Sequence, residues 1–360
     1  MRVFLSLVFY LTSSVLGFEL RDAYEHLDEV EAAVGPEVFE EVRFDYLLEL
    51  VKEFGIIDHF DISPEALIEH TKLTEKEAGN FYQGSSLSDE LVKRYLLPFR
   101  IRYESSAQPR WRQRLNEVFT PIVKESKSAD EAAGLICAWM NESFTILKPA
   151  TSYPLSIRGD LDPITVLRGK HGREIDLAIF GVAAFRSIGI PARLVWAPAL
   201  RDEIGGKVWL EYLSEKKEWQ TWVPSFRESK NHRLKLIKDY GEKIVFLFAN
   251  PRSPIEVTQS YVKVVDLHIQ SSGEDVHCGI LVKGSEDLHL SRDSSLLDQQ
   301  PASSNFFFRV GRGEIILSVG TVNNEFSLTP MNLPPNVKKV EVSLKGVRAV
   351  VTKKFEEENR

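Results

Sequence analysis

The chain has 360 residues, of which 43% are hydrophobic, and a formal net charge of −7 at pH 7. This length is enough for two or three domains, each with a hydrophobic core of its own. The net negative charge, without a basic cluster beyond what a solvated face carries, argues against a nucleic-acid-binding protein.

Residues 1–17 have the pattern of a secretory signal peptide. Arg2 supplies the positive charge, residues 3–11 supply the apolar segment, and Gly17 is the small residue at the expected cleavage point. The apolar segment is shorter than the roughly 18 residues that a secure membrane span needs, and no later segment reaches that length. We therefore expect a protein that is secreted or periplasmic and has no stable transmembrane span. An N-terminal anchor that is not cleaved is the alternative.

Residues 18–125 are expected to form an N-terminal helical region. Apolar residues recur with helical spacing over residues 24–33 and 36–54. Ser63 is placed as the N-cap of a further helix, with Pro64 at its first position.

Residues 126–258 are expected to form a mixed domain of helices and strands. Ser128 and Glu131 have the spacing of a capping box at the start of a helix. Residues 177–188 are apolar at nearly every position, which predicts a helix buried on all sides and ended by Gly189. Segments rich in Trp, Tyr, Val and Leu then predict an antiparallel meander. Its strands are expected at residues 192–200, 207–213 and 219–226.

Residues 259–360 are expected to form a small β-sandwich, because turn signals separate a series of short β-type segments. Strands are predicted at residues 261–269, 278–282, 305–310, 314–319, 325–330 and 338–344. His268, His277 and His289 fall in this region and are expected to be scattered strand or loop residues, not metal ligands. We expect neither a metal nor a cofactor.

The two cysteines, Cys137 and Cys278, are expected to be buried free thiols. Two cysteines in an exported chain could pair, but they do not make a disulfide framework. Both lie far in sequence from the start of the helix expected at 177–188.

The segment that follows the expected buried helix resembles a known family. Residues 185–195, with the sequence FRSIGIPARLV, are similar to a signature of the transglutaminase-like superfamily. Residues 162–172 resemble the loop that leads to that family's nucleophile, and residues 95–104 resemble a segment ahead of the core in secreted bacterial members. The resemblance implies an α+β protein with a papain-like transglutaminase core, a buried helix packed with an antiparallel sheet. The N-terminal helical region and the C-terminal β-sandwich would flank this core.

The resemblance also identifies three catalytic positions. In the family a Cys begins the buried helix, a His opens a following strand, and an Asp lies on the next strand. The helix N-terminus lowers the pKa of the thiol, the imidazole pairs with the thiolate, and the carboxylate orients the imidazole. By motif position these places hold Glu174, Lys207 and Val223 here. The resemblance therefore implies a scaffold without its nucleophile, because a carboxylate attacks an amide poorly.

Glu174 and Lys207 would preserve the charges of a thiolate and imidazolium pair, with the anion at a helix N-terminus. We therefore predict a salt bridge between them, with a carboxylate-to-ammonium distance within about 4 Å. The alternative is that both side chains point to solvent.

The first functional interpretation is a catalytically inactive, exported protein that acts as a binding or structural module for peptide, protein or cell-envelope glycan. Trp196, Trp209 and Trp222 are its candidate ligand-binding residues, and core packing is their alternative role.

The second interpretation is an active amide hydrolase or transamidase with an altered site at His171, Glu174 and Lys207. Convergence of these three side chains in an open cleft would favour catalysis, whereas a closed salt bridge would favour the binding module.

Overall fold

The structure is a computed structural model that falls into two compact units. It describes residues 20–54, 58, 61–82, 86–102, 104, 109–147, 160–198, 200–202, 206–227, 231–251, 254–271, 276–283, 288–291, 305–321, 326–345 and 348–356. The first unit comprises Met1–Leu194, Trp209–Glu228 and Asn250–Arg252, and the second comprises Val195–Val208, Ser229–Ala249 and Ser253–Arg360. The expected signal peptide, residues 1–17, lies outside the described residues.

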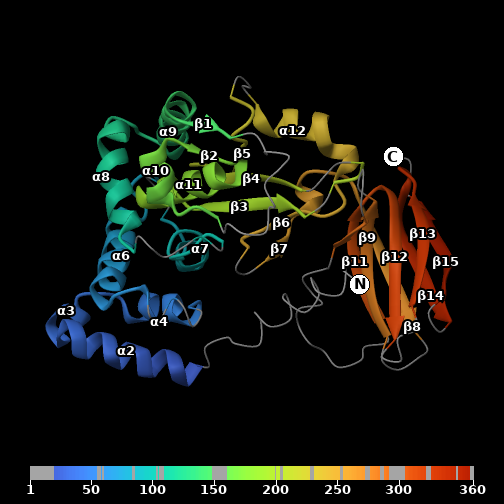
Figure 1. The fold of residues 1–360 in the computed structure, drawn as a ribbon, viewed down its shortest axis with the longest axis horizontal. Coiled ribbons are helices and arrows are strands. Elements are labelled where there is room, and N and C mark those ends of the chain that lie inside the picture. Colours follow the sequence, from blue (N-terminus) through green and yellow to red (C-terminus); the bar gives the residue numbers. More distant parts are fainter. Residues whose placement is uncertain are drawn as a thin grey trace. The chain divides into compact units, whose positions relative to one another are not determined.

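The first unit begins with the expected helical region (Figure 1). Its helices are α2 (Leu20–Val34), α3 (Pro36–Glu40), α4 (Phe44–Lys52), α6 (Pro64–Glu77), α7 (Asp89–Tyr95) and α8 (Trp111–Val123). The single helix predicted over residues 36–54 is two helices, α3 and α4. The chain is extended at Arg43, whose backbone N–H donates to the Glu75 carboxylate at 2.9 Å, and α4 begins at the next residue. The Glu75 carboxylate therefore accepts from the Arg43 N–H, which in a continuous helix would have bonded to a backbone carbonyl one turn earlier.

Both predicted helix starts are confirmed. The Ser63 hydroxyl accepts a hydrogen bond from the backbone N–H of Ala66, and the Ser128 hydroxyl accepts one from the N–H of Glu131, each at 3.3 Å. These bonds satisfy N–H groups that the first turn of a helix leaves without partners. The Ser128 cap opens α9 (Ala129–Ser143).

Residues 162–172, which resemble a loop, contain a short helix, α10 (Pro163–Gly169). The Asp162 carboxylate caps it by accepting from the N–H groups of Ile164 and Thr165, each at 3.0 Å. Pro163 occupies the first position, where a missing N–H costs nothing. A capping carboxylate followed by proline is typical of a helix start. This local signal explains why part of the expected loop is helical.

The central helix, α11 (Glu174–Ser187), is buried on all sides as predicted, and it begins three residues earlier than its apolar run. It contacts α8, α9 and α10 (Figure 1). On the sheet side, a Cβ atom at Gly181 would lie only 2.3 Å from Leu210 Cδ2, so the glycine allows the sheet to pack against the helix. Gly189 ends the helical segment with a φ of 87°, a conformation that glycine adopts without strain.

The predicted meander is present as β3 (Ala192–Ala197), β4 (Lys207–Leu213) and β5 (Trp219–Trp222). Strands β4 and β5 pair in antiparallel register, with Leu210 opposite Trp222. Within the first unit β3 adjoins β4, because the Leu213 N–H donates to the Pro191 carbonyl at 2.9 Å and Arg193 forms a salt bridge with Glu211. A separate two-stranded parallel pair joins β1 (Thr145–Ile146) to β2 (His171–Gly172).

Two buried polar side chains, Arg112 and His70, tie α6, α8 and α11 together in the first unit. The Arg112 guanidinium donates to the backbone carbonyls of Arg186 and Leu96, each at 2.5 Å, and to His70 Nδ1 at 3.3 Å. Since Nδ1 accepts from Arg112, His70 is neutral and carries its proton on Nε2, which donates to the Leu97 carbonyl at 2.8 Å. Burial, and next the charge of Arg112, lower the pKa of His70 well below its usual value.

We expect the free energy of unfolding to fall as the pH drops below about 6.5, by up to about 1.4 kcal/mol per pH unit from His70 alone. The depressed pKa means that the unfolded chain takes up a proton there before the folded chain does. Urea unfolding of the wild type and of His70→Asn between pH 5 and pH 8 tests this, with the variant expected to show a flatter pH dependence. Equal slopes in the two proteins would contradict it.

The second unit contains α12 (His232–Tyr240) and most of the strands (Figure 1). Residues 244–249 have a strand-like sequence, but only Phe248–Ala249 form a strand, β6, which pairs with both β3 and β7 (Ile255–Glu256). Two four-stranded sheets follow, in the orders β10-β9-β12-β13 and β11-β8-β14-β15. Their bounds are β8 (Val264–Ser271), β9 (Val276–Lys283), β10 (Leu288–Ser291), β11 (Asn305–Gly311), β12 (Gly313–Thr321), β13 (Phe326–Leu333), β14 (Val337–Lys345) and β15 (Arg348–Glu356).

Alternate residues of both sheets meet in one hydrophobic cluster. Val265 and Leu267 of β8 and Leu317 of β12 belong to it and are fully buried. His268 lies on the opposite face of β8, with its ring 4.5 Å from that of Phe307. The side chains of His277 and His289 lie outside the described part. The mixed α and β architecture with a strand-rich C-terminal region is thus confirmed. No helix among the described residues has the length and apolar character needed to cross a bilayer.

Candidate functional site

The start of α11 is the position that the sequence motif predicts for the nucleophile of the family. Glu174 is the first residue of this helix and is half-buried. Its carboxylate accepts a hydrogen bond from the hydroxyl of Ser225, an exposed residue that follows β5. The positive end of the helix dipole favours an anion here. Position 174 therefore holds a hydrogen-bonded carboxylate at a helix N-terminus.

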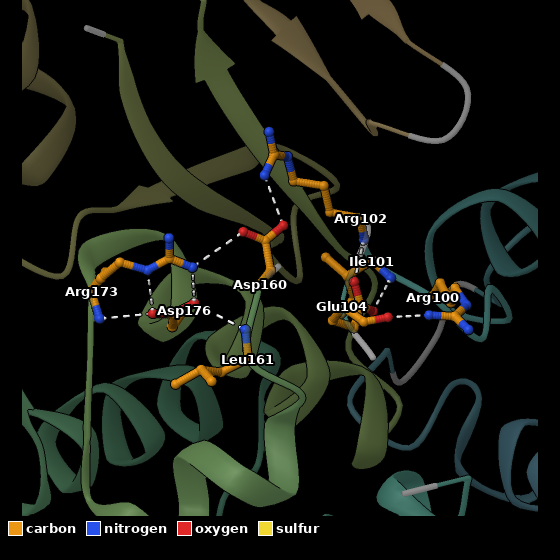
Figure 2. A network of polar contacts seen from close by, with 8 residues as sticks. All are labelled: Arg100, Ile101, Arg102, Glu104, Asp160, Leu161, Arg173 and Asp176. Carbon is orange, nitrogen blue, oxygen red and sulfur yellow. Dashed lines mark hydrogen bonds and ion pairs between the residues drawn. The ribbon is translucent and has the colours of Figure 1, made fainter. Parts of the chain in front are cut away.

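A second carboxylate fixes the backbone around this position. Asp176 is 1% exposed and accepts four hydrogen bonds. Three come from Arg173, from its backbone N–H at 2.9 Å and from Nε and Nη2 at 2.8 Å each, and one comes from the backbone N–H of Leu161 at 3.1 Å. Figure 2 shows these groups converging on the carboxylate. Asp176 thus joins the first turn of α11 to the segment ahead of α10.

Asp160 extends this network to the segment at residues 95–104. Its carboxylate lies 2.7 Å from Arg102 Nη1 and 3.5 Å from Arg173 Nη2 (Figure 2). Glu104 folds back on the same segment and accepts from the backbone N–H groups of Ile101 at 2.5 Å and Arg102 at 2.7 Å. Arg102 and Glu104 therefore hold this segment in place.

The other expected catalytic positions hold groups of different chemistry. Val223 follows β5 and is completely buried, so a hydrocarbon side chain stands at the position predicted for the family's carboxylate. Lys207 opens β4 and belongs to the second unit, where its ammonium lies 5.5 Å from the centre of the Tyr240 ring. The salt bridge between Glu174 and Lys207 stays a prediction.

His171 is an exposed residue of β2, three positions before the start of α11. Its Nδ1 lies 2.6 Å from the Gly169 carbonyl, so Nδ1 is the donor and Nε2 is left for other partners. A proton-transfer role for His171 stays a prediction.

The candidate ligand-binding tryptophans lie among packed side chains. Trp209 and Trp222 are buried in the first unit, with Trp209 only 1% exposed. Trp196 is half-buried in the second unit, where its ring lies 5.6 Å from that of Phe248. Their positions favour the core-packing role that the sequence left open.

Neither cysteine begins a helix. Cys137 lies in the middle of α9, where burial raises the pKa of its thiol above the ordinary range. Cys278 lies in β9, and burial raises the pKa of its thiol to about 12. Both thiols are free; Cys278 is buried as expected, whereas Cys137 is only half-buried. Within the described ranges, no group of three or more His, Cys, Asp or Glu side chains could hold a metal ion.

Sequence reasoning missed Asp160, Asp176 and Ser225. Asp176 had a local signal, because it stands three residues after the N-cap Arg173 and bonds back to that backbone N–H. Asp160 and Ser225 had none, since their partners lie 58 and 51 residues away along the chain.

Comparison with known proteins matches residues 116–224 to the transglutaminase-like superfamily. A search of curated proteins gives no match. Three solved structures are similar to this chain. An inferred cysteine protease from Cytophaga hutchinsonii has 11% identity and a TM-score of 0.31, over 71% of this chain and 63% of that one. An inferred protease from Parabacteroides distasonis has 12% identity and a TM-score of 0.31, over 44% and 29%.

The third structure is the periplasmic domain of TgpA from Pseudomonas aeruginosa, determined with bound ethylmercury. It has 17% identity and a TM-score of 0.26, over 32% of this chain and 45% of that one. This chain therefore spans less than two thirds of each of these three proteins. The matched residues contain α11, the motif at residues 185–195 and the ion pair of Asp176 with Arg173, while Ser225, the partner of Glu174, lies one residue beyond them. The chain thus carries a transglutaminase-like domain, at residues 116–224.

Proposed function

We propose that this protein is an exported, catalytically inactive transglutaminase-like protein that acts as a binding or structural module for peptide, protein or cell-envelope glycan. One observation carries the proposal: the first residue of α11 is a glutamate whose carboxylate accepts a hydrogen bond from Ser225. Acyl transfer of the papain type needs a thiolate at that place, and a hydrogen-bonded carboxylate is a much weaker nucleophile toward an amide.

The other two positions support the same conclusion. Buried Val223 offers no hydrogen-bond acceptor, so it cannot orient an imidazole, and Lys207 offers no imidazole. The two cysteines do not compensate, because burial raises the pKa of both thiols and disfavours the reactive thiolate.

A binding role is consistent with the polar groups that are accessible near the start of α11. Glu174 is half-exposed, and His171 and Ser225 are exposed. Carboxylate, imidazole and hydroxyl groups suit the amides of a peptide or the hydroxyls of a glycan. The contacts between Arg173 and Asp176 fix the backbone on both sides of Glu174. Less conformational freedom is then lost at Glu174 when a ligand binds.

Export rests on the signal-peptide pattern of residues 1–17. In the organisation that we propose, residues 18–125 form the helical region, residues 126–258 the transglutaminase-like domain and residues 259–360 the C-terminal strand domain.

The triple substitution Glu174→Cys, Lys207→His, Val223→Asp tests the proposal. We expect it to create a thiol with a pKa below about 7, against about 8.5 for an ordinary cysteine, because the helix N-terminus stabilises the thiolate. Iodoacetamide labelling between pH 5 and pH 9 measures that pKa. The matched control is Leu135→Cys, an exposed position in the middle of α9, where we expect an ordinary thiol pKa.

Amidase and transamidase assays complete the test. We expect no turnover by the wild type and measurable turnover by the triple variant. Wild-type turnover that Glu174→Gln abolishes would instead establish the second interpretation, an active hydrolase with an altered site.

A further inference from the structure

Two exposed aromatic residues and a half-buried one form a patch on the N-terminal helices of the first unit. The patch, hereafter the aromatic patch, consists of Tyr24 of α2, Phe39 of α3 and Phe44 of α4. The ring of Phe44 lies 6.2 Å from that of Tyr24 and 6.3 Å from that of Phe39. Tyr24 is 45% exposed and Phe44 is 44% exposed. Three helices thus bring their aromatic residues together at the surface.

The aromatic patch is separate from the core that these helices share. Helix α2 buries Ala23, Leu27 and Val30 on its inner side, and α4 buries residues that include Leu47 and Leu50. The helices therefore already have an apolar contact face. Large aromatic side chains exposed side by side, beyond that face, are typical of a surface that binds another molecule.

Acidic residues are concentrated in the part of the sequence that carries the patch. Residues 20–54 contain eleven Asp and Glu against three Lys and Arg, a net charge of −8, while the whole chain carries −7. Exposed carboxylates stand beside the patch residues or one helical turn away from them. They are Glu25, Asp28, Glu37, Glu40 and Glu41. The negative charge of this protein is therefore concentrated around its exposed aromatic rings.

We propose that the aromatic patch is a docking surface for a basic segment of a partner protein, one that carries an apolar anchor residue between lysines or arginines. The rings would bury the anchor, and the carboxylates around them would attract the flanking cations and set the orientation. The same charge disfavours two other occupants, because a second copy would bring its own acidic patch and an anionic membrane its own negative headgroups. The surface is independent of position 174.

Selection from a displayed library of random peptides on the full chain tests the proposal. We expect enriched peptides in which basic residues flank a Leu, Phe or Trp. Titration calorimetry of one such peptide measures its dissociation constant. We expect Phe44→Ser to weaken binding about tenfold or more, and Glu37→Gln with Glu40→Gln to weaken it several-fold, an effect that shrinks in high salt. Tyr24→Ser provides a second patch variant if Phe44→Ser does not fold.

Matched controls lie on α9 and near its start. Leu135→Ser removes a side chain that is 45% exposed, and Glu125→Gln with Glu142→Gln removes two exposed carboxylates. Both are expected to bind the peptide as the wild type does. Neutral or acidic enriched peptides, or equal binding by the Phe44→Ser and Tyr24→Ser variants, would overturn the proposal. So would sedimentation of a dimer, or binding to phosphatidylglycerol vesicles, that Phe44→Ser abolishes, because the occupant would then be a second copy or a membrane.

Discussion

Gly189→Ala is expected to lower the free energy of unfolding by about 4 kcal/mol. The glycine has a φ of 87°, and a Cβ atom there would lie 2.0 Å from the carbonyl oxygen of Glu77 at the end of α6. Backbone strain and a clash with another backbone therefore add, and neither is relieved by a side-chain rotation. Urea unfolding followed by tryptophan fluorescence measures the change.

Two other glycines separate these contributions. Gly79 has a φ of 92° and open space around it, so Gly79→Ala reports the backbone strain without the clash, about 1 to 2 kcal/mol. Gly134 lies inside α9 with no atom within 4 Å of a built Cβ, so Gly134→Ala is expected to stabilise the protein by about 0.5 to 1 kcal/mol. A Gly189→Ala variant no less stable than Gly79→Ala would show that the close approach to Glu77 is absent.

Glu211→Gln is expected to cost about 3 to 5 kcal/mol, because it leaves a buried guanidinium without its counter-charge. The Glu211 carboxylate is 1% exposed and lies 2.6 Å from Arg193 Nη2 and 2.7 Å from Arg193 Nε. The guanidinium also lies 4.0 Å from the centre of the Trp219 ring, so the pair links β3, β4 and β5. Thermal and urea unfolding give the change in stability.

The double variant Arg193→Met, Glu211→Leu removes both charges and is expected to be more stable than Glu211→Gln alone. Glu117→Gln breaks an exposed ion pair with Arg114 at 3.2 Å, and we expect it to cost less than about 1 kcal/mol. A Glu211→Gln variant as stable as Glu117→Gln would mean that solvent reaches the Arg193 guanidinium.

Local signals predict much of this fold. The apolar run of α11, the caps at Ser63 and Ser128, and the strand bounds at 207–213 can all be read from a few neighbouring residues. The motif after α11 predicts the family, and its arginines have structural roles. Arg186 donates to the carbonyls of Ala192 and Pro98, at 3.0 and 3.2 Å, which explains why a charged residue belongs in an otherwise apolar helix.

The parts that sequence reasoning missed depend on partners far along the chain. The break between α3 and α4 depends on Glu75, and the anchor of the segment at 100–104 depends on Asp160. The identity of residue 174 was readable, but its hydrogen bond from Ser225 was not, because nothing near either residue indicates the other. The spacing of hydrophobic residues indicates which face of a helix or strand is buried. It does not indicate which distant side chain accepts a hydrogen bond from a given donor.

The division of the chain between the two units limits how the protein can be shortened. The polypeptide passes from one unit to the other five times, twice within strands β3 and β4. A protease that cuts a single bond therefore releases neither unit whole. A stop codon between residues 209 and 253 removes strands β8 to β15 from the second unit but retains other pieces of it. Transfer of either unit into another protein would require several chain segments to be joined at once. We therefore expect the two units to occur together in related proteins.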